Sequence, residues 1–486
     1  MNAIAGIYGS RTSLSEIETM VKLMGHRGRS KQIIREKTFT GIELDTLKQE
    51  GEQSGKKEKI LFSGKIYNAE ELKKLLDGPE TRYEHRDDLL VLDLYQSRGK
   101  DSVKLLEGVF AFAVYDEEKG LLMARDPFGI EPLYISEDEK EILFASEMKA
   151  MSSMKGGFRE FPIGSIYEEG KGFEKYYSIP EKSGKIRSFD AAVKGIRDHL
   201  ERAVKKRIER ERPFGVYLSG GLDSSIIAAI TAEKVQGIDS FAVGMKGSED
   251  LKHARLCAEY LGTNHHEYVY DLKEMLSVLP DVIYHLESYD AALVRSSVAN
   301  FLLARLAGEK ADVVFSGEGA DELFCGYSQF RTMNEEEANE EMVEMLGTLH
   351  STGLQRGDRM SLTQGIRARV PFLDPHMVEY AMRIPLSMKI GPQGQEKWIL
   401  RKAYEDMLPE EILYRKKDKF SVGAGSSEKL AEVAEKTISD REFLEMKVTP
   451  AGNALRSKEE LMYYKIFKEF YPEPSVERSI DFTKVI

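Results

Sequence analysis

Two glycine-bearing turns that carry acidic residues are the clearest chemical signals in the sequence. The first is YLSGGLDSS at residues 217–225, where Ser219, Gly220 and Gly221 follow a short apolar run and precede an expected helix. Backbone N–H groups at the electropositive start of a helix bind phosphate. No lysine follows in the GxxxxGK[ST] spacing. The turn therefore suits pyrophosphate, the leaving group when ATP is cleaved between its α and β phosphates.

Carboxylates beside such a turn indicate a cation. Asp223 lies in the first turn, and a second turn, FSGEGADELFCGY at residues 315–327, contributes Glu318 and Asp321. A carboxylate beside a triphosphate needs a cation between them, and Mg²⁺ is typically bound by one or two carboxylates together with phosphate oxygens. We therefore expect ATP and Mg²⁺, with Asp223 as one metal ligand and either Asp321 or Glu318 of the second turn as the other. Either turn alone is as consistent with a structural role, but two acidic turns on one sheet favour function.

The elements that must position these turns read as strands alternating with helices. The runs PFGVYL, DSFAVGM and ADVVF each end in a glycine-bearing turn, and the first and third lead into an expected helix. This alternation predicts a parallel sheet, and such sheets bind ligands at the carboxyl ends of their strands. Before them, apolar residues from Val193 to Ile208 recur at helical spacing. The polar segment at residues 178–188 is the expected linker, and the first 180 residues are rich in short strand-like runs such as 106–116 and 141–147.

Composition limits the classes of function. A chain of 486 residues favours two domains, and its net charge of −12 argues against a nucleic-acid binder. The two cysteines, Cys257 and Cys325, exclude a disulfide framework and fit a reducing compartment. The N-terminus has no secretory pattern, and no apolar run is long enough to cross a bilayer. We expect a cytoplasmic enzyme with neither nucleic acid nor membrane as a partner.

The order of the motifs resembles that of the glutamine-dependent asparagine synthetases. The two turns are followed by DRMSLTQGIRARVPFLD and RKKDKFSVGAG, and preceded by GHRGRS, FSGKIYN, RDPFGIEPLY and FASEMKA, so that the resemblance covers nearly the whole chain. It implies an α+β, Ntn-hydrolase-like domain at residues 1–180, an αββα sandwich of the class II glutamine amidotransferase type. An α/β domain of the adenine-nucleotide α-hydrolase-like (PP-loop ATP pyrophosphatase) class, with a parallel sheet, would follow at residues 188–486.

The resemblance also implies a reaction and roles for single residues. The second domain would join a carboxylate, by default that of aspartate, to AMP, and ammonia would then displace the AMP. Glu318 is implied to assist at the acyl centre and Lys417 to stabilise charge on the phosphates, as a preorganised cation does. The resemblance further implies that Arg295, Glu318 and Asp321 bind the substrate. It also implies that Asp223 and Asp321 hold Mg²⁺. The implied contacts to ATP or pyrophosphate are Leu218, Ser219, Gly220, Gly221, Asp223, Ser224, Val243 and Gly317.

The first domain departs from the family pattern where glutamine would react. The family has a cysteine at position 2, which acts as nucleophile with its own α-amine as base. Here Asn2 offers a carboxamide, which is not a nucleophile, and Met before Asn is normally retained. Ser63 replaces the oxyanion asparagine, Arg86 replaces an aspartate, and residues 41–45 lack the expected arginine. We therefore predict that glutaminase activity is lost. A separate glutaminase that supplies ammonia, and a homodimer, stay open.

A second departure concerns the acyl substrate. The family stretch resembling ETYDVTTIRAS reads ESYDAALVRSS at residues 287–297, so Ala292 and Leu293 replace two threonines, and Arg367 replaces a usual glutamate. Sites built on hydrogen bonds discriminate strongly between substrates. Two alternatives therefore stay open beside aspartate: a β-lactam-synthetase-like ligase that joins another amine to another carboxylate, and a non-catalytic binding protein that kept the fold.

Overall fold

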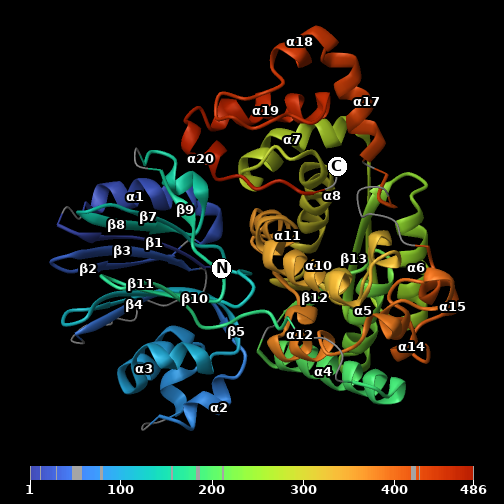
Figure 1. Ribbon diagram of the computed structural model, residues 1–486, viewed down its shortest axis with the longest axis horizontal. Helices are drawn as coiled ribbons and strands as arrows, with labels where there is room; N and C mark the ends of the chain where they lie inside the picture. The colour runs from blue at the N-terminus through green and yellow to red at the C-terminus, as the bar shows by residue number, and fades with distance from the viewer. Residues whose placement is uncertain are drawn as a thin grey trace. The chain divides into compact units, whose positions relative to one another are not determined.

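The chain forms two units in the computed structural model (Figure 1), which describes residues 2–10, 13–28, 30–45, 57–76, 80–154, 157–181, 186–210, 213–416, 423–425 and 427–484. The first unit comprises residues 1–178 and 471–480, and the second comprises residues 179–470 and 481–486. Residues 471–480 lie within the range 188–486 expected for the second domain, and in the structure they group with the first unit. That segment contains α20 (Pro474–Arg478), and the hydroxyl of Ser475 donates to the carbonyl of Ser152 at 2.9 Å.

The first unit contains two antiparallel sheets. One has the strand order β2-β3-β1-β8-β7-β9 and the other β11-β10-β6-β5-β4. The runs expected as strands at 106–116 and 141–147 contain β5 and β8. The strands are β1 (Asn2–Gly9), β2 (Ser30–Arg35), β3 (Phe39–Asp45), β4 (Glu58–Ile66), β5 (Gly108–Asp116), β6 (Gly120–Arg125), β7 (Tyr134–Glu137), β8 (Glu141–Ala145), β9 (Arg159–Glu160), β10 (Ser165–Glu168) and β11 (Gly172–Lys175).

Helices cover the outer faces of these two sheets. Helix α1 (Leu14–Leu23) lies on the first sheet, and α2 (Ala69–Lys73) and α3 (Asp87–Arg98) lie beyond the second (Figure 1). Residues 109–114 of strand β5 are all apolar, and side chains on both faces of the strand are buried. Phe110 and Phe112 belong to the core that includes α3, whereas Ala111 and Ala113 belong to the core that includes Phe144 of the other sheet.

The second unit is built on the predicted parallel sheet, which the structure confirms. Its order is β14-β13-β12-β15-β16, and every neighbouring pair is parallel. Helices α5 (Leu222–Lys234) and α6 (Glu249–Leu261) pack on one face, and α8 (Ala291–Ala307) and α11 (Gly353–Leu362) pack on the other (Figure 1). The strands are β12 (Phe214–Tyr217), β13 (Asp239–Met245), β14 (Asn264–Tyr270), β15 (Val313–Phe315) and β16 (Arg367–Arg369).

The helices of the second unit begin with the amphipathic helix that the sequence predicts. Ile196, Leu200 and Val204 on α4 are fully buried, as the helical spacing requires. The α-helices are α4 (Phe189–Arg210), α5 (Leu222–Lys234), α6 (Glu249–Leu261), α7 (Leu272–Leu286), α8 (Ala291–Ala307), α9 (Ala320–Leu323), α10 (Glu335–Thr348), α11 (Gly353–Leu362), α12 (Pro375–Ala381), α13 (Leu386–Lys389), α14 (Trp398–Ala403), α15 (Glu410–Leu413), α17 (Ser427–Thr437), α18 (Asp440–Glu445) and α19 (Lys458–Phe470).

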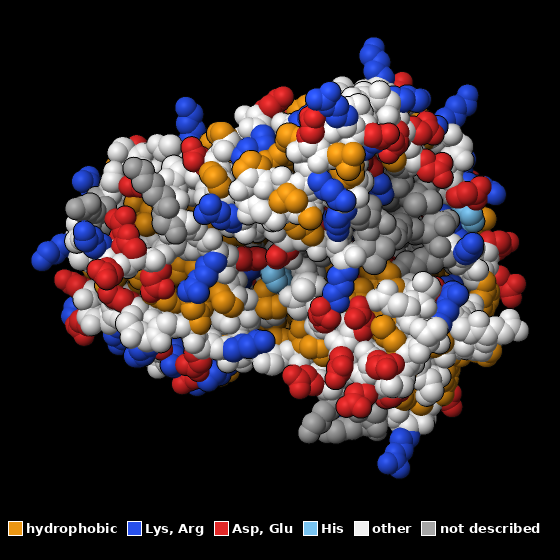
Figure 2. All heavy atoms as spheres, turned by 45° about the horizontal axis from the view of Figure 1, so that its top comes forward, with side chains coloured by type: hydrophobic (Ala, Val, Ile, Leu, Met, Phe, Trp, Pro, Cys, Tyr) orange, Lys and Arg blue, Asp and Glu red, His pale blue; other side chains and the backbone are white. Residues whose placement is uncertain are grey.

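The face shown in Figure 2 carries charges of both signs among exposed apolar and uncharged side chains. On the face shown in Figure 2, acidic and basic side chains alternate, and its described residues form no broad basic patch of the kind that nucleic acid requires. Among the helices of the described ranges, none is both long enough and apolar enough to span a membrane.

Candidate functional site

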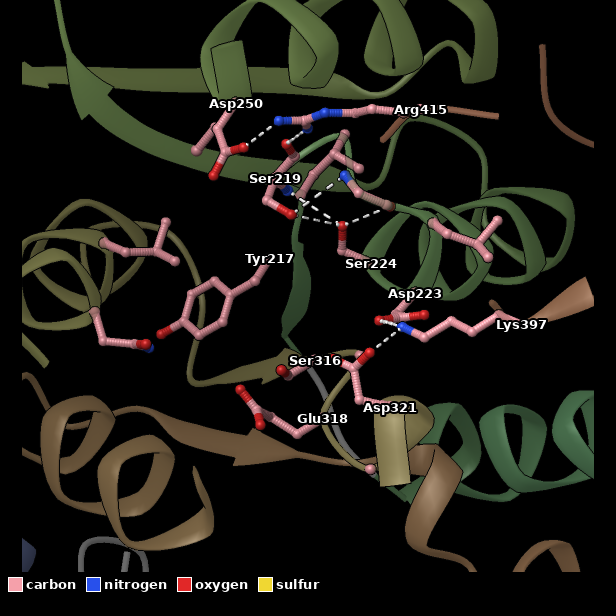
Figure 3. Close-up of a pocket in the computed structure, with 18 of the residues that line it drawn as sticks. Tyr217, Ser219, Asp223, Ser224, Asp250, Ser316, Glu318, Asp321, Lys397 and Arg415 are labelled. Carbon is pink, nitrogen blue, oxygen red and sulfur yellow. Dashed lines mark hydrogen bonds and ion pairs between the residues drawn. The ribbon is translucent and has the colours of Figure 1, made fainter. Parts of the chain in front are cut away.

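A cavity of about 220 Å³ lies at the carboxyl ends of β12, β13 and β15. Both acidic turns open into it, and Figure 3 shows their side chains converging there from the two strand ends. Parallel sheets bind ligands at this edge. The predicted site residues that line the cavity are Leu218, Ser219, Gly221, Asp223, Ser224, Val243, Gly317, Glu318 and Asp321.

The first turn is folded as a tight loop at the start of α5. Gly220 has a φ of +68°, and a Cβ there would come within 2.4 Å of the carbonyl carbon of His253, so only glycine fits. The hydroxyl of Ser224 accepts from the backbone N–H of Ser219 at 3.2 Å and donates to the carbonyl of Gly221 at 3.1 Å. These bonds hold the loop closed, with the N-terminal N–H groups of α5 toward the cavity, as phosphate binding requires.

The two predicted metal ligands meet on a lysine. Lys397 Nζ lies 2.5 Å from Asp223 Oδ2 and 2.6 Å from Asp321 Oδ1 (Figure 3). The side chain of Lys397 is 5% exposed, and its backbone lies in the left-handed region with a φ of +56°. Burial lowers the pKa of this ammonium, but the two carboxylates outweigh burial and raise the pKa above its ordinary value. The ammonium therefore stays charged and balances the acid pair.

Two glycines allow these groups to approach one another. A Cβ at Gly317 would lie 2.8 Å from Cβ of Asp223, so a side chain there would push the second turn away from the first. A Cβ at Gly326 would lie 1.9 Å from Asp321 Oδ1 and 2.4 Å from Cε of Lys397. Close approach of the two turns therefore depends on the absence of side chains at these positions.

Glu318 and Glu322 add further acid to the second turn. Glu318 forms an ion pair with Arg356 of α11. Glu322 is buried, and the hydroxyl of Tyr327 donates to its Oε1 at 2.7 Å. Burial, and next the neighbouring charge of Asp321, raise the pKa of Glu322 to about 7. Perturbed carboxyl groups in a cavity are typical of functional sites.

Arg415 connects the first turn to α6. Its Nη1 donates to the carbonyl of Ser219 at 3.0 Å, and its Nη2 lies 2.5 Å from Oδ1 of Asp250 (Figure 3). The predicted catalytic Lys417 follows two residues later and lies outside the described residues. Neither Arg415 nor Lys397 was predicted as a site residue.

The structure does not bring Arg295 to the cavity wall. Its Nε donates to both carboxylate oxygens of Glu459 at 2.9 Å, and the hydroxyl of Tyr463 donates to Glu459 at 2.6 Å. Helix α8 reaches the cavity further along, through Asn300 and Leu303.

Of the predicted phosphate-binding residues, Gly220 does not line the cavity, because its α-carbon faces His253. The substituted positions Ala292 and Leu293 lie in the first turn of α8. Arg367 is in β16, beside β15. The described residues that line the cavity include none of the three substitutions, Ala292, Leu293 and Arg367. The direct contacts proposed for the acyl substrate therefore rest on Glu318 and Asp321.

Asp223 and Asp321, here called the acid pair, suit Mg²⁺ both in the type of their ligand atoms and in the number of carboxylates. Two carboxylate oxygens converge on one cation, and hard oxygen ligands are those that Mg²⁺ prefers. Within the described ranges, no group of three or more His, Cys, Asp or Glu side chains is placed to hold a metal ion. A metal here would thus complete its coordination with phosphate and water, which is the usual mode for Mg²⁺.

In the first unit, the positions that differ from the glutaminase pattern are engaged in internal contacts. The hydroxyl of Ser63 donates to Glu131 Oε2 at 2.9 Å. Arg86 donates to both oxygens of Asp88, at 3.0 and 2.9 Å, and this bond is the largest cause that raises the pKa of Arg86. Both Ser63 and Arg86 therefore form hydrogen bonds with acidic side chains of the first unit itself.

Comparison with known proteins agrees with the geometry of the site. The model of the family "Asparagine synthase" matches residues 195–335 and 332–485, and that of "Glutamine amidotransferase domain" matches residues 1–162. The chain belongs to the asparagine synthetase family. Asparagine synthetase B [glutamine-hydrolyzing] of Escherichia coli K12 is 35% identical over 98% of this chain and 92% of its own length. Asparagine synthetase [glutamine-hydrolyzing] of Asparagus officinalis is 39% identical over 86% of this chain and 74% of its own.

A probable asparagine synthetase [glutamine-hydrolyzing] of Dictyostelium discoideum is also similar, with 38% identity over 85% of this chain and 81% of its own. Among solved structures, NMN synthetase from Francisella tularensis aligns with 62% of this chain and 100% of its own, at a TM-score of 0.29 and 12% identity.

Proposed function

We propose that this member of the asparagine synthetase family is an ATP-dependent, AMP-forming amide ligase that uses free ammonia. The acyl substrate is a small carboxylate, by default aspartate, and the first unit is an Ntn-hydrolase-like glutaminase domain without activity. The observation that carries the proposal is the convergence of Asp223 and Asp321 on one cation, beside a phosphate-type loop at the sheet edge. This arrangement supports cleavage of ATP between its α and β phosphates.

The residues of the cavity divide the reaction between them. The N–H groups of residues 219–224 would hold the pyrophosphate portion of ATP, and Ser224 keeps their loop closed. Mg²⁺, when bound by Asp223 and Asp321, would supply positive charge to the phosphate oxygens. Glu318 lines the same cavity. When ammonia attacks the acyl carbon and AMP departs, Glu318 would accept a proton from the ammonia nitrogen. Lys417 would stabilise the leaving group.

Free ammonia is proposed because the first unit lacks the groups that hydrolyse glutamine. Asn2 has no nucleophilic atom. Ser63 and Arg86 are hydrogen-bonded to Glu131 and Asp88 of the same unit, which supports the proposal that neither replaces the lost groups. Ammonia would come from solution or from a separate glutaminase. A homodimer and a cytoplasmic location complete the proposal.

Product analysis with two nitrogen donors tests the proposal. The purified chain is incubated with ATP, Mg²⁺ and aspartate, and with either ammonium chloride or ammonia-free glutamine. We expect asparagine and AMP in equal amounts with ammonium, and no glutamate above the blank with glutamine. The Asp321→Asn variant controls for contaminating ligases, and we expect it to form neither asparagine nor AMP. Glutamate release by the wild-type chain would refute the loss of glutaminase activity.

Another carboxylate or amine is the second candidate, since Ala292 and Leu293 bring no hydroxyl to the start of α8. Exchange of labelled pyrophosphate into ATP with a panel of amino acids and their derivatives distinguishes the two. Exchange with another carboxylate but not with aspartate would favour a β-lactam-synthetase-like reaction. Absence of exchange with every carboxylate would favour a binding protein without catalysis.

A further inference from the structure

Lys397 occupies the position at which the acid pair would hold a metal ion. We propose that the Lys397 ammonium excludes free divalent cations from Asp223 and Asp321, and that the metal enters with a pyrophosphate group, onto which the ammonium then moves. The inference deepens the proposed function and rests on it in one respect, that this cavity binds ATP with a metal.

The geometry does not allow the two cations to bind the same oxygens together. The ammonium nitrogen lies 2.5 Å from Asp223 Oδ2 and 2.6 Å from Asp321 Oδ1. A Mg²⁺ ion would need those oxygens at about 2.0–2.1 Å and tolerates little distortion of its octahedron. The lysine must therefore release Asp223 Oδ2 and Asp321 Oδ1 before the metal can bind these two oxygens.

Displacing the lysine is costly unless an anion receives it. Its side chain is 5% exposed, so the displaced ammonium cannot simply move into bulk water. Its backbone is fixed in the left-handed region at the start of α14, and Gly326 packs against its Cε, which limits where Nζ can go. Ser219 and residues 221–224 of the first turn line the same cavity, and pyrophosphate bound to this turn would present its oxygens there. Those oxygens would replace the carboxylates as partners of the ammonium.

This exchange makes the binding of metal and of pyrophosphate mutually dependent. Free metal must uncover a buried ammonium, whereas metal that arrives with pyrophosphate brings the replacement partner. Each ligand then raises the affinity of the other by the same factor. Loss of the Lys397 charge should therefore strengthen the binding of metal alone and weaken its dependence on pyrophosphate.

Mn²⁺ binding to the full chain, followed by electron paramagnetic resonance, tests this inference. Mn²⁺ alone is titrated into the wild type and into Lys397→Met, with and without inorganic pyrophosphate. Without pyrophosphate we expect Lys397→Met to bind Mn²⁺ about 5- to 150-fold more tightly, the usual range of coupling between sites. With pyrophosphate the difference should vanish or reverse.

Lys416→Met is the matched control. Lys416 also lines the cavity, and the same substitution removes one positive charge without uncovering the acid pair. We expect it to change the affinity for Mn²⁺ alone by less than about threefold, as a charge screened by water does. Melting curves give a second readout: Mn²⁺ alone should raise the melting temperature of Lys397→Met more than that of the wild type. A Lys397→Met chain that folds only with Mn²⁺ present would also support exchange of the two cations.

Equal Mn²⁺ affinity of wild type and Lys397→Met without pyrophosphate would overturn the inference. So would a wild-type chain that binds Mn²⁺ equally well with and without pyrophosphate. If ATP–pyrophosphate exchange proceeds in either case, the proposed function stands and only the role of Lys397 fails. If the wild type shows no ATP–pyrophosphate exchange and does not bind Mn²⁺ in the presence of pyrophosphate, both the proposed function and the role of Lys397 are refuted.

Discussion

Gly317 is the position at which one methyl group should separate the two acidic turns. An alanine Cβ there would lie 2.8 Å from three atoms of Asp223 and Ser224, two of them backbone. Backbone cannot rotate away as a flexible side chain can, so the turns must move apart by about 0.6 Å to reach an ordinary contact of 3.4 Å. Since Asp223 and Asp321 belong to different turns, this displacement changes the spacing of the acid pair itself.

The expected size of the effect follows from that displacement. A misplacement near 1 Å costs on the order of 100-fold in rate, so about 0.6 Å predicts a loss of roughly 10- to 100-fold in ATP–pyrophosphate exchange. Overpacking of this kind costs about 1–3 kcal/mol of folding stability. The exchange assay measures the first quantity, and urea unfolding measures the second.

Gly347→Ala provides the control for this prediction. Gly347 lies in α10, and a Cβ there would meet no described atom within 4 Å. Alanine is favoured over glycine in a helix, so this variant should keep full exchange and gain up to about 1 kcal/mol of stability. A Gly317→Ala chain with wild-type exchange would refute the argument that the glycine sets the spacing of the acids.

The remaining predictions concern the first unit, the buried acid and the two thiols. Asn2→Cys, with Met1 removed, should release no glutamate from glutamine, because Arg86 stays bound to Asp88; Asn2→Ala, processed in the same way, serves as the blank. Burial and Asp321 raise the pKa of Glu322 from 4.5 to about 7, so the metal-free wild type should lose stability as the pH rises between these values. Glu322→Gln should melt with less dependence on pH over that range. Burial raises the pKa values of Cys257 and Cys325 to about 11, so a disulfide reagent at pH 8 should modify both thiols only after unfolding.

The sequence predicts best what depends on neighbouring residues. The short strands before each turn, the glycines of the loop and the acids that follow them lie within a few residues of each other. The parallel sheet then places the two turns at one edge, as the alternation of strands and helices requires. For the same reason α4 is found where the spacing of apolar residues predicts it.

Contacts between distant parts of the chain were not predictable in this way. The segment 471–480 packs in the first unit through hydrogen bonds such as that from the Ser479 hydroxyl to the Phe158 carbonyl. No local sequence pattern predicts these contacts. Arg295 was expected at the substrate from its motif alone, but its partner Glu459 lies 164 residues further along. Nothing in the sequence around either residue indicates that pairing.

The missed residue Lys397 shows what a motif leaves out. A motif names the acids that a bound metal would satisfy, but the ligand-free chain must also balance those acids, since two uncompensated carboxylates on adjoining turns would repel each other. The balancing charge comes from 174 residues beyond Asp223, and among 70 lysines and arginines its sequence context does not single it out. Only its left-handed backbone and its burial between both acids do so. Paired acids at a predicted metal site are therefore a reason to look in the fold for the cation that holds their place.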